Sequence, residues 1–431
     1  MPNPKPWLQI PHNSDFTIHN LPFGIFSTSE KVKRVGMAIG DKVVDLKTAA
    51  DEGLFEETEF NYSVLESDYL NEMIALGKEV TSQIREIVQK ALYDEHSVLV
   101  KIEGIMEEMS AVTMHLPVKV GDYTDFYSSL EHATNVGSMF RDPENALLPN
   151  WKHLPVGYHG RASSIVVSGT EIRRPKGQIL PDDSNNPVFG LTQRLDFELE
   201  VAFVVGKETK PGDTVSLDEA EGYIFGLVLF NDWSARDIQK WEYQPLGPFL
   251  GKSFASTISP WVVPLEALEP FRAKGPEQNP EPLGYLKVNG DKNFDISLEA
   301  AIQPNGSKKP TAICNTNFKH LYWNMAQQLT HHTSNGCNLN VGDMMASGTI
   351  SGPEPGSLGC MLEITQNGTK PITLDSGEKR NWIGDGDTVT LRGFAEKDGV
   401  RVGFGECVGR VIQAGTKSPP LKGESAEGTG G

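Results

Sequence analysis

The chain has 431 residues, 38% of them hydrophobic, and a formal net charge of −18. This composition is typical of a globular protein with two domains, or with one large and one small domain. The acidic charge argues against nucleic acid and against an anionic membrane as partners, because both bind clustered Lys and Arg. It fits a protein that gathers carboxylates around a cation.

Cysteine spacing and the two ends of the chain give further limits. The cysteines at 314, 337, 360 and 407 include no Cys-x-x-Cys pair, so neither a zinc site nor a disulfide framework is indicated. The N-terminus lacks a signal segment, and no apolar run approaches the roughly 20 residues of a membrane helix. We therefore expect a cytoplasmic protein.

Residues 1–117 are predicted to form a small structural or lid-like domain. The runs Arg34 to Ile39 and Lys42 to Leu46, joined at Gly40-Asp41, predict a hairpin. Apolar residues at 80, 84, 87, 88 and 91 predict one face of a helix. A boundary near Pro117 separates this unit from a larger domain at 118–415. The remainder, 416–431, is rich in Ser, Gly, Pro and Glu, and we expect it to be disordered.

The segment 121–141 is dense in acidic, phenolic, imidazole and guanidinium groups. Ser128 or Ser129 is suited to cap a helix, which would place His132 about one turn inside it and Asp125 just before it. A lone histidine in a helix is more often a packing residue, so this segment alone leaves its role open.

The segment 196–205 alternates polar and apolar residues as a β-strand does. Glu198 and Glu200 would project side by side from a face that becomes apolar at Ala202. Two readings are open: a strand with one solvated face, or two carboxylates that share a cation or a proton.

A buried strand is predicted at 222–230, and it ends at Asn231-Asp232. We expect a helix to start at Ser234, with Asp237 at the capping-box position. Its face would carry Arg236, Gln239, Lys240 and Tyr243, although a solvated face has the same spacing. The turn-rich stretch 247–256 would bring the Lys252 ammonium and the Ser256 hydroxyl into a cleft.

The C-terminal third contains four features of interest. A helix is predicted near 316–332, and the loop 346–353 could hold an anion through its backbone and the Thr349 hydroxyl. Glu363 lies in an alternating segment, 360–364, that predicts a strand. The acidic run 384–387 lacks the later ligands of an EF-hand, so we interpret it as a turn before a strand at 388–394.

Asp125, Glu198, Glu200 and Asp232 offer only oxygen ligands, with no cysteine or clear histidine partner. Such a set selects Mg²⁺ or Ca²⁺ over zinc. Their spacing alone does not bring them together.

Several segments resemble a known family. They are Gly-Asp-Tyr-Thr-Asp-Phe-Tyr-Ser-Ser (121–129), His-Ala-Thr-Asn-Val-Gly (132–137), Leu-Pro-Val-Gly-Tyr-His-Gly-Arg-Ala-Ser-Ser (154–164), Asp-Phe-Glu-Leu-Glu (196–200), Asn-Asp-Trp-Ser-Ala-Arg-Asp-Ile-Gln (231–239) and Gly-Pro-Phe-Leu-Gly-Lys-Ser-Phe (247–254). Through them the chain resembles the fumarylacetoacetase family over nearly its whole length, the C-terminal tail excepted. The acidic strand recurs across the wider superfamily, whereas the block 121–164 is specific to this branch.

The resemblance implies a mixed α+β, β-rich fold, with a small SH3-like barrel domain followed by a large β-roll or sandwich catalytic domain, assembled as a homodimer. It implies metal-dependent hydrolysis of the carbon–carbon bond of 4-fumarylacetoacetate, a diketo acid, to fumarate and acetoacetate. This is the last step of tyrosine and phenylalanine catabolism.

The resemblance also assigns roles to matching residues. The divalent-metal ligands match Asp125, Glu198, Glu200 and Asp232, and a cation-associated pair matches Lys252 and Ser256, where the family usually has Thr in place of Ser256. The general base matches His132 and the acid that orients it matches Glu363. The groups that stabilise the oxyanion match Arg236, Gln239 and Lys252. The substrate contacts match Tyr127, Arg141, Tyr158, Gln239, Tyr243 and Thr349.

These roles agree with the chemistry that the residues offer, because a histidine poised by a carboxylate can activate water and no Ser-His-Asp or Cys-His nucleophile set is evident. Two alternatives stay open: an acylpyruvate hydrolase, oxaloacetate decarboxylase or dienoate isomerase of the same superfamily, and an inactive binding scaffold. The first group is shorter and lacks the 121–164 block, and an inactive copy has no reason to keep every acid and His132.

Overall fold

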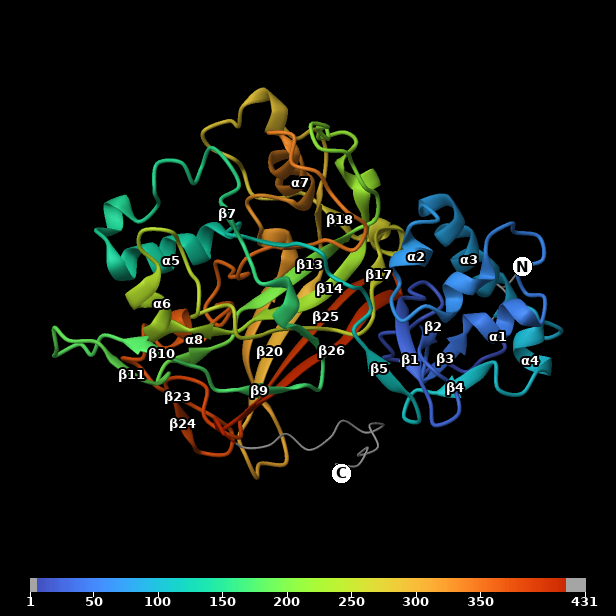
Figure 1. Ribbon diagram of the computed structural model, residues 1–431, viewed down its shortest axis with the longest axis horizontal. Helices are drawn as coiled ribbons and strands as arrows, with labels where there is room; N and C mark the ends of the chain where they lie inside the picture. Colours follow the sequence, from blue (N-terminus) through green and yellow to red (C-terminus); the bar gives the residue numbers. More distant parts are fainter. Residues whose placement is uncertain (1–5, 416–431) are drawn as a thin grey trace, which may run out of the picture.

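The computed structural model describes residues 6–415, so the tail predicted at 416–431 lies outside the described part. Figure 1 shows an N-terminal unit of helices around a curled sheet, beside a larger body built on two extended sheets. The predicted fold class, mixed α+β and rich in β structure, is confirmed. Within residues 6–415, the helices are all too short or too polar to cross a membrane.

The N-terminal unit is a five-stranded sheet in the order β4-β3-β2-β1-β5. The predicted hairpin is confirmed as β2 (Arg34–Ile39) and β3 (Lys42–Asp45). The predicted helix is α3 (Lys78–Ala91), which buries Ile84 and Val88 against the sheet. The remaining elements are β1 (Phe23–Ser27), β4 (Met106–Glu108), β5 (Thr113–His115), α1 (Leu46–Asp51), α2 (Asn71–Ile74) and α4 (Val98–Lys101).

The larger body contains an eight-stranded sheet in the order β7-β6-β22-β13-β14-β16-β8, with β17 also paired to β14. Its strands are β6 (Tyr123–Phe126), β7 (Gly157–His159), β8 (Ile165–Val167), β13 (Leu199–Val205), β14 (Ile224–Asp232), β16 (Ser256–Ile258), β17 (Val263–Pro264) and β22 (Met344–Ala346). This sheet carries the acids that the sequence singled out.

A second sheet of five strands packs against the first, in the order β21-β20-β25-β26-β9. Its strands are β9 (Glu171–Arg173), β20 (Ser297–Gln303), β21 (Thr311–Asn317), β25 (Thr388–Lys397) and β26 (Val400–Ile412). Two-stranded pairs are β10 (Lys176–Ile179) with β11 (Val188–Leu191), β12 (Leu195–Asp196) with β15 (Ser234–Ala235), β18 (Arg272–Ala273) with β19 (Asn293–Phe294), and β23 (Ile372–Thr373) with β24 (Lys379–Arg380).

Helices of the larger body lie at the ends and edges of these sheets (Figure 1). The α-helices are α5 (Leu130–Phe140), α6 (Arg236–Glu242), α7 (Met325–Thr333) and α8 (Met361–Ile364). Short 3-10 helices span Pro143–Asn145, Ala162–Ser164, Ala220–Tyr223, Leu265–Phe271, Gly284–Leu286 and Phe318–His320, and one more, Tyr62–Glu66, lies in the N-terminal unit.

Strand β13 is buried on both faces. Val201, Phe203 and Val205 belong to the hydrophobic core shared with the five-stranded sheet of the larger body. Ala202 and Val204 instead join the core of the N-terminal unit. The acidic residues before them are buried too, so the reading of a strand with one solvated face is wrong.

Several local predictions were wrong in detail. The segment 196–205 is not one strand, because β12 ends at Asp196, β13 begins at Leu199, and Glu198 makes an isolated bridge with Cys360. Helix α6 begins at Arg236, because Ser234 pairs with β12. The Asp237 carboxylate does not cap the helix and instead accepts from the Thr192 hydroxyl and the Gln193 N–H. The helix expected near 316–332 begins only at Met325.

Candidate active site

Four carboxylates converge across the central strands of the eight-stranded sheet. Asp125 comes from β6, Glu200 from β13 and Asp232 from the end of β14, while Glu198 lies just before β13. One oxygen of each lies within 4.8 Å of the others. All four residues are at most 5% exposed.

Strand pairing explains this convergence. Asp125, Ala346 and Ala202 are aligned across β6, β22 and β13. Because β22 ends at Ala346, the chain then turns away at Gly348, whose φ is +77° and whose added Cβ would lie 2.3 Å from a backbone oxygen. The Gly348 N–H donates to Glu200 Oε2 at 2.9 Å. A glycine is therefore needed for the backbone to approach the cluster this closely.

Cationic and hydroxyl groups hold two of the four acids. Lys252 Nζ lies 2.6 Å from Asp232 Oδ2 and 2.8 Å from Glu198 Oε2. The Ser256 hydroxyl donates to Asp232 Oδ1 at 2.9 Å, because Ser256 on β16 pairs directly with Asp232. Burial raises the pKa of Glu198, but Lys252 and Arg236 outweigh it and hold that pKa well below its ordinary value.

The other two acids lack such partners. Burial, with the neighbouring carboxylates, raises the pKa of Asp125 and of Glu200 well above the ordinary range. Asp125 Oδ1 and Glu200 Oε1 are buried without a hydrogen-bond partner, which is costly for an anion. The nearby cations are Lys252 and Arg236. Four buried carboxylates in this setting are chemically matched to a divalent metal ion.

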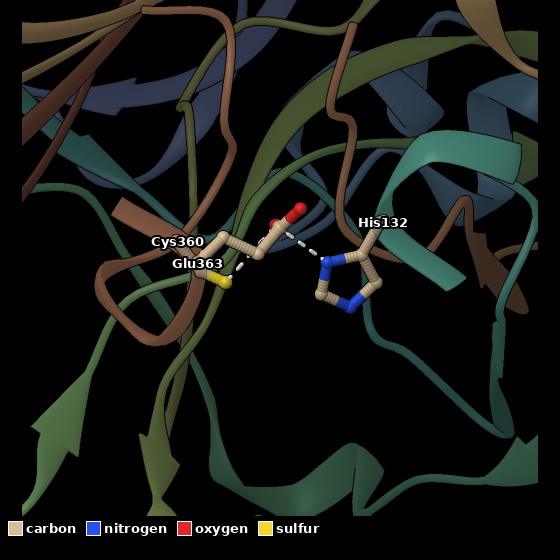
Figure 2. A group of neighbouring side chains, drawn as sticks. All are labelled: His132, Cys360 and Glu363. Carbon is tan, nitrogen blue, oxygen red and sulfur yellow. Dashed lines mark hydrogen bonds and ion pairs between the residues drawn. The ribbon is translucent and has the colours of Figure 1, made fainter. Parts of the chain in front are cut away.

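A histidine–glutamate pair lies nearby on two helices. His132 is in the first turn of α5, capped by the Ser129 hydroxyl as the sequence predicted. Its Nδ1 lies 2.6 Å from Glu363 Oε2. Figure 2 shows Nε2 on the opposite side of the ring, away from this carboxylate. A short bond at Nδ1 fixes the orientation of the ring and leaves Nε2 as the reactive nitrogen.

Glu363 is held by further donors. Its Oε2 also accepts from the Ser351 hydroxyl at 2.8 Å and from the Cys360 thiol at 3.2 Å (Figure 2), and its Oε1 accepts from Asn135 Nδ2 at 2.8 Å. Burial raises the pKa of Glu363, but His132 and these hydrogen bonds together lower it below the ordinary value. Glu363 therefore stays an anion beside the imidazole. It lies in α8, so the predicted strand at 360–364 is wrong.

Comparison with known proteins places the chain in a family. Residues 19–117 match the family model "Fumarylacetoacetase N-terminal", and residues 122–412 match "Fumarylacetoacetate (FAA) hydrolase C-terminal". Fumarylacetoacetase of Bos taurus is 52% identical over 413 residues, covering 95% of this chain and 99% of that protein, and that of Homo sapiens is 51% identical with the same coverage. The chain belongs to the fumarylacetoacetase family.

A solved structure extends the likeness to the fold. Fumarylacetoacetate hydrolase from psychrophilic Exiguobacterium antarcticum aligns with a TM-score of 0.53 at 18% identity, over 91% of this chain and 99% of that one. At this identity the likeness concerns the fold alone, and the fumarylacetoacetase family is established by the closer sequence matches.

Some residues matched to oxyanion and substrate roles in the fumarylacetoacetase family lie beside the acids. Arg236 Nη1 is 2.6 Å from Glu198 Oε1 and 3.3 Å from Gln239 Oε1, whereas its Nη2 is buried without a partner. The Tyr158 hydroxyl donates to Asp232 Oδ2 at 3.0 Å. The Tyr127 ring packs edge-on against His132, with centroids 5.2 Å apart.

Thr349 lies in the loop after β22, and its Oγ1 is buried without a partner. Two other matched residues contact neither the acids nor His132. The guanidinium of Arg141 donates to the Ala146 carbonyl, and Tyr243 is 47% exposed with its hydroxyl accepting from Gln244.

Several residues that complete the site could not be predicted from the sequence. Ser351, Asn135 and Cys360 surround Glu363, and Ser234 donates to Glu198 at 2.9 Å. Asp196 pairs with Arg236. Each lies within a few residues of a group that the sequence did select, but polar residues of these types are common and only folding shows which of them turn inward.

Proposed function

We propose that this chain hydrolyses 4-fumarylacetoacetate at a carbon–carbon bond, giving fumarate and acetoacetate. The observation that carries the proposal is the 2.6 Å His132–Glu363 pair beside a buried cluster of four carboxylates. Membership of the fumarylacetoacetase family, with relatives of that name at about half identity over 95% of the chain, supports this substrate over those of the wider superfamily.

Asp125, Glu198, Glu200 and Asp232 would hold Mg²⁺ or Ca²⁺, both of which prefer oxygen ligands. Lys252 and Ser256 would fix Asp232 in the orientation that the ion needs, through the contacts at 2.6 and 2.9 Å. When bound, the ion would supply Lewis-acid stabilisation to the oxygens of the diketone and of the leaving enolate.

His132 would act as the general base. Its Nε2 takes a proton from water, and the water oxygen forms a bond to the carbonyl carbon. Glu363, kept anionic by its donors, stabilises the imidazolium that results. A base placed in this way contributes about 10²–10⁴-fold to the rate.

Arg236, Gln239 and Lys252 would donate to the oxyanion of the tetrahedral intermediate, and the unpartnered Arg236 Nη2 is available for this. A fixed donor of this kind is worth about 10²–10³-fold. When the carbon–carbon bond breaks, its electron pair passes to the acetoacetate fragment as an enolate. The proton held by His132 then neutralises that carbon, so one water is consumed and no other reactant is needed.

Substrate contacts are proposed for six side chains: Tyr127, Arg141, Tyr158, Gln239, Tyr243 and Thr349. Tyr158 and Thr349 have the strongest support, because one touches Asp232 and the other presents an unpartnered buried hydroxyl. Arg141 and Tyr243 have less support, since their hydrogen-bond partners are Ala146 and Gln244.

We also propose a homodimer in the cytoplasm, acting in tyrosine and phenylalanine catabolism. The hairpin β10–β11 and the segment after α6 expose Phe189, Leu246 and Phe249 at 75%, 97% and 67%. The hairpin also contacts α6 itself, since Trp241 on α6 donates to Gln178, the residue paired with Phe189. Exposed apolar side chains gathered in this way are typical of an interface.

The proposal is tested by incubating the purified chain with fumarylacetoacetate and Mg²⁺ or Ca²⁺, and following the loss of substrate and the release of fumarate. Turnover that stops with EDTA and returns with either ion supports it. Intact substrate contradicts it. Acylpyruvate and oxaloacetate, supplied in parallel, would identify a related activity, and binding without turnover of any of the three would identify an inactive scaffold.

A further inference from the structure

Asp196 is a fully buried carboxylate next to the proposed active site, and it has no role in the mechanism above. Its two oxygens accept four hydrogen bonds. Oδ1 accepts from the backbone N–H of Phe197 at 2.9 Å and of Met361 at 2.7 Å. Oδ2 accepts from the Leu362 N–H at 3.0 Å and from Arg236 Nε at 2.8 Å.

Two of these donors belong to the helix that carries Glu363. Met361 and Leu362 are the first residues of α8, and Cys360, the residue before them, makes no capping bond of its own. Asp196 therefore caps α8 from a distant part of the chain, where an anion also interacts favourably with the exposed N–H groups. The position of Glu363, and through it the orientation of His132, depends on this anchor.

The fourth donor, Arg236, links Asp196 to the acidic cluster. Arg236 uses Nε for Asp196 and Nη1 for Glu198, at 2.8 and 2.6 Å. A series of short contacts therefore connects Glu198 of the cluster to Arg236, Arg236 to Asp196, and Asp196 to α8. Helix α8 carries Glu363, which contacts His132. These contacts join the two halves of the site, which come from different elements.

We propose that Asp196 is a positioning residue, which sets the separation between the His132 imidazole and the acidic cluster without touching the substrate. The inference rests on the proposed function for the roles of His132 and the cluster. Displacing a catalytic group by about 1 Å costs about 10²-fold in rate. Asp196 holds both α8, which carries Glu363, and Arg236, which pairs with Glu198. Asp196 therefore controls turnover more than binding.

The test compares Asp196→Asn with Asp237→Asn. Both remove a buried carboxylate in the same region, but the Asp237 carboxylate accepts from the Thr192 hydroxyl, from Gln193 N at 2.7 Å and from Ile238 N at 3.0 Å, and from neither the Arg236 guanidinium nor α8. We expect Asp196→Asn to lower kcat about 10²-fold with KM and calorimetric Mg²⁺ affinity each within about threefold of wild type. Asp237→Asn should lose stability and keep kcat.

A second measurement needs no substrate. The proton in the short Nδ1–H···Oε2 bond should give a strongly downfield NMR signal, assigned by its loss in His132→Gln. Asp196→Asn should shift or abolish this signal, and Asp237→Asn should retain it. A wild-type chain that does not turn over fumarylacetoacetate would refute the proposed function, while this signal would still test the role of Asp196.

Wild-type kcat with an unchanged signal in Asp196→Asn would overturn the inference, and so would a loss of Mg²⁺ affinity as large as the loss of turnover. If Asp196→Asn does not fold, Asp196→Glu serves instead, because it keeps the charge and moves the carboxylate by one methylene. A clear fall in kcat at nearly unchanged melting temperature would support positioning, and wild-type kcat would refute it.

Discussion

Replacing Glu200 by Gln gives a direct test of the acidic cluster. Glu200 Oε1 has no partner, and burial beside Asp125, Glu198 and Asp232 raises the Glu200 pKa well above its ordinary value. Without a cation, the folded state therefore loses stability as the pH rises above the unfolded value of 4.5, because the folded state binds the proton more tightly. The Gln amide mimics the protonated acid and still accepts from Gly348.

The magnitude follows from two terms. Without a cation, the Glu200 carboxyl must either stay charged with no partner or take up a proton, and removing this cost should stabilise the cation-free protein by about 1–3 kcal/mol at neutral pH. For a chain of 431 residues this raises the melting temperature by about 1–2 °C per kcal/mol, scaled from smaller domains. A cation at 100 times its Kd stabilises the wild type by about 2.7 kcal/mol, whereas a variant that binds about 10²-fold more weakly gains only about 0.4 kcal/mol.

Differential scanning fluorimetry in EDTA, and then in Mg²⁺ or Ca²⁺, checks both terms. Glu200→Gln should melt higher than wild type in EDTA and lose most of the shift that the cation gives. The matched control is Glu221→Gln, because Glu221 is paired with Arg272 and Lys292 and its pKa is lowered by them against the effect of burial. It should melt lower with or without cation. A Glu200→Gln protein that melts lower in EDTA and keeps the full cation shift would refute the reasoning.

Three further substitutions test the rest of the site. His132→Ala should lower kcat about 10²–10⁴-fold and leave the cation affinity measured by calorimetry near wild type; a large loss of affinity would assign His132 to the metal site. Glu363→Gln should lower kcat at least about 10²-fold. Because the folded-state pKa of Glu363 is lowered, its stabilising contribution is present above 4.5 and is lost as the pH falls through the folded value, so urea unfolding of this variant should depend less on pH in that range. Thr349→Val should raise KM about tenfold without loss of melting temperature, because the hydroxyl has no partner to lose; unchanged steady-state KM would exclude it from the substrate site.

The sequence was most informative where periodicity and local chemistry agree. The hairpin at Gly40, the helix α3 and the Ser129 cap could be predicted because each depends on contacts within a few residues. The oxygen-only set of acids was identified from residue type. Their convergence could not be derived from spacing, because β22 comes from more than a hundred residues later and aligns Asp125 with Ala202, which follows Glu200 on β13.

Predictions were wrong where tertiary contacts override a local pattern. The alternation from 196 to 205 is regular, but the backbone leaves the ladder between Asp196 and Leu199 so that Asp196 can reach α8 and Arg236. The segment with Glu363 alternates like a strand, and it forms a helical turn because that distant carboxylate caps it. In both cases the contacts that change the local structure come from residues far away in the sequence, so the local pattern does not reveal them.

The two-sided burial of β13 has a consequence for how the chain is divided. Ala202 and Val204, directly after Glu200 on the same face, are covered by apolar side chains of the N-terminal unit. Without that cover, water would reach the sheet behind the carboxylates, and the higher local dielectric would weaken every charge interaction among them. The smaller unit, although it supplies no reacting group in the proposed mechanism, thereby contributes to the electric field in which the chemistry would occur.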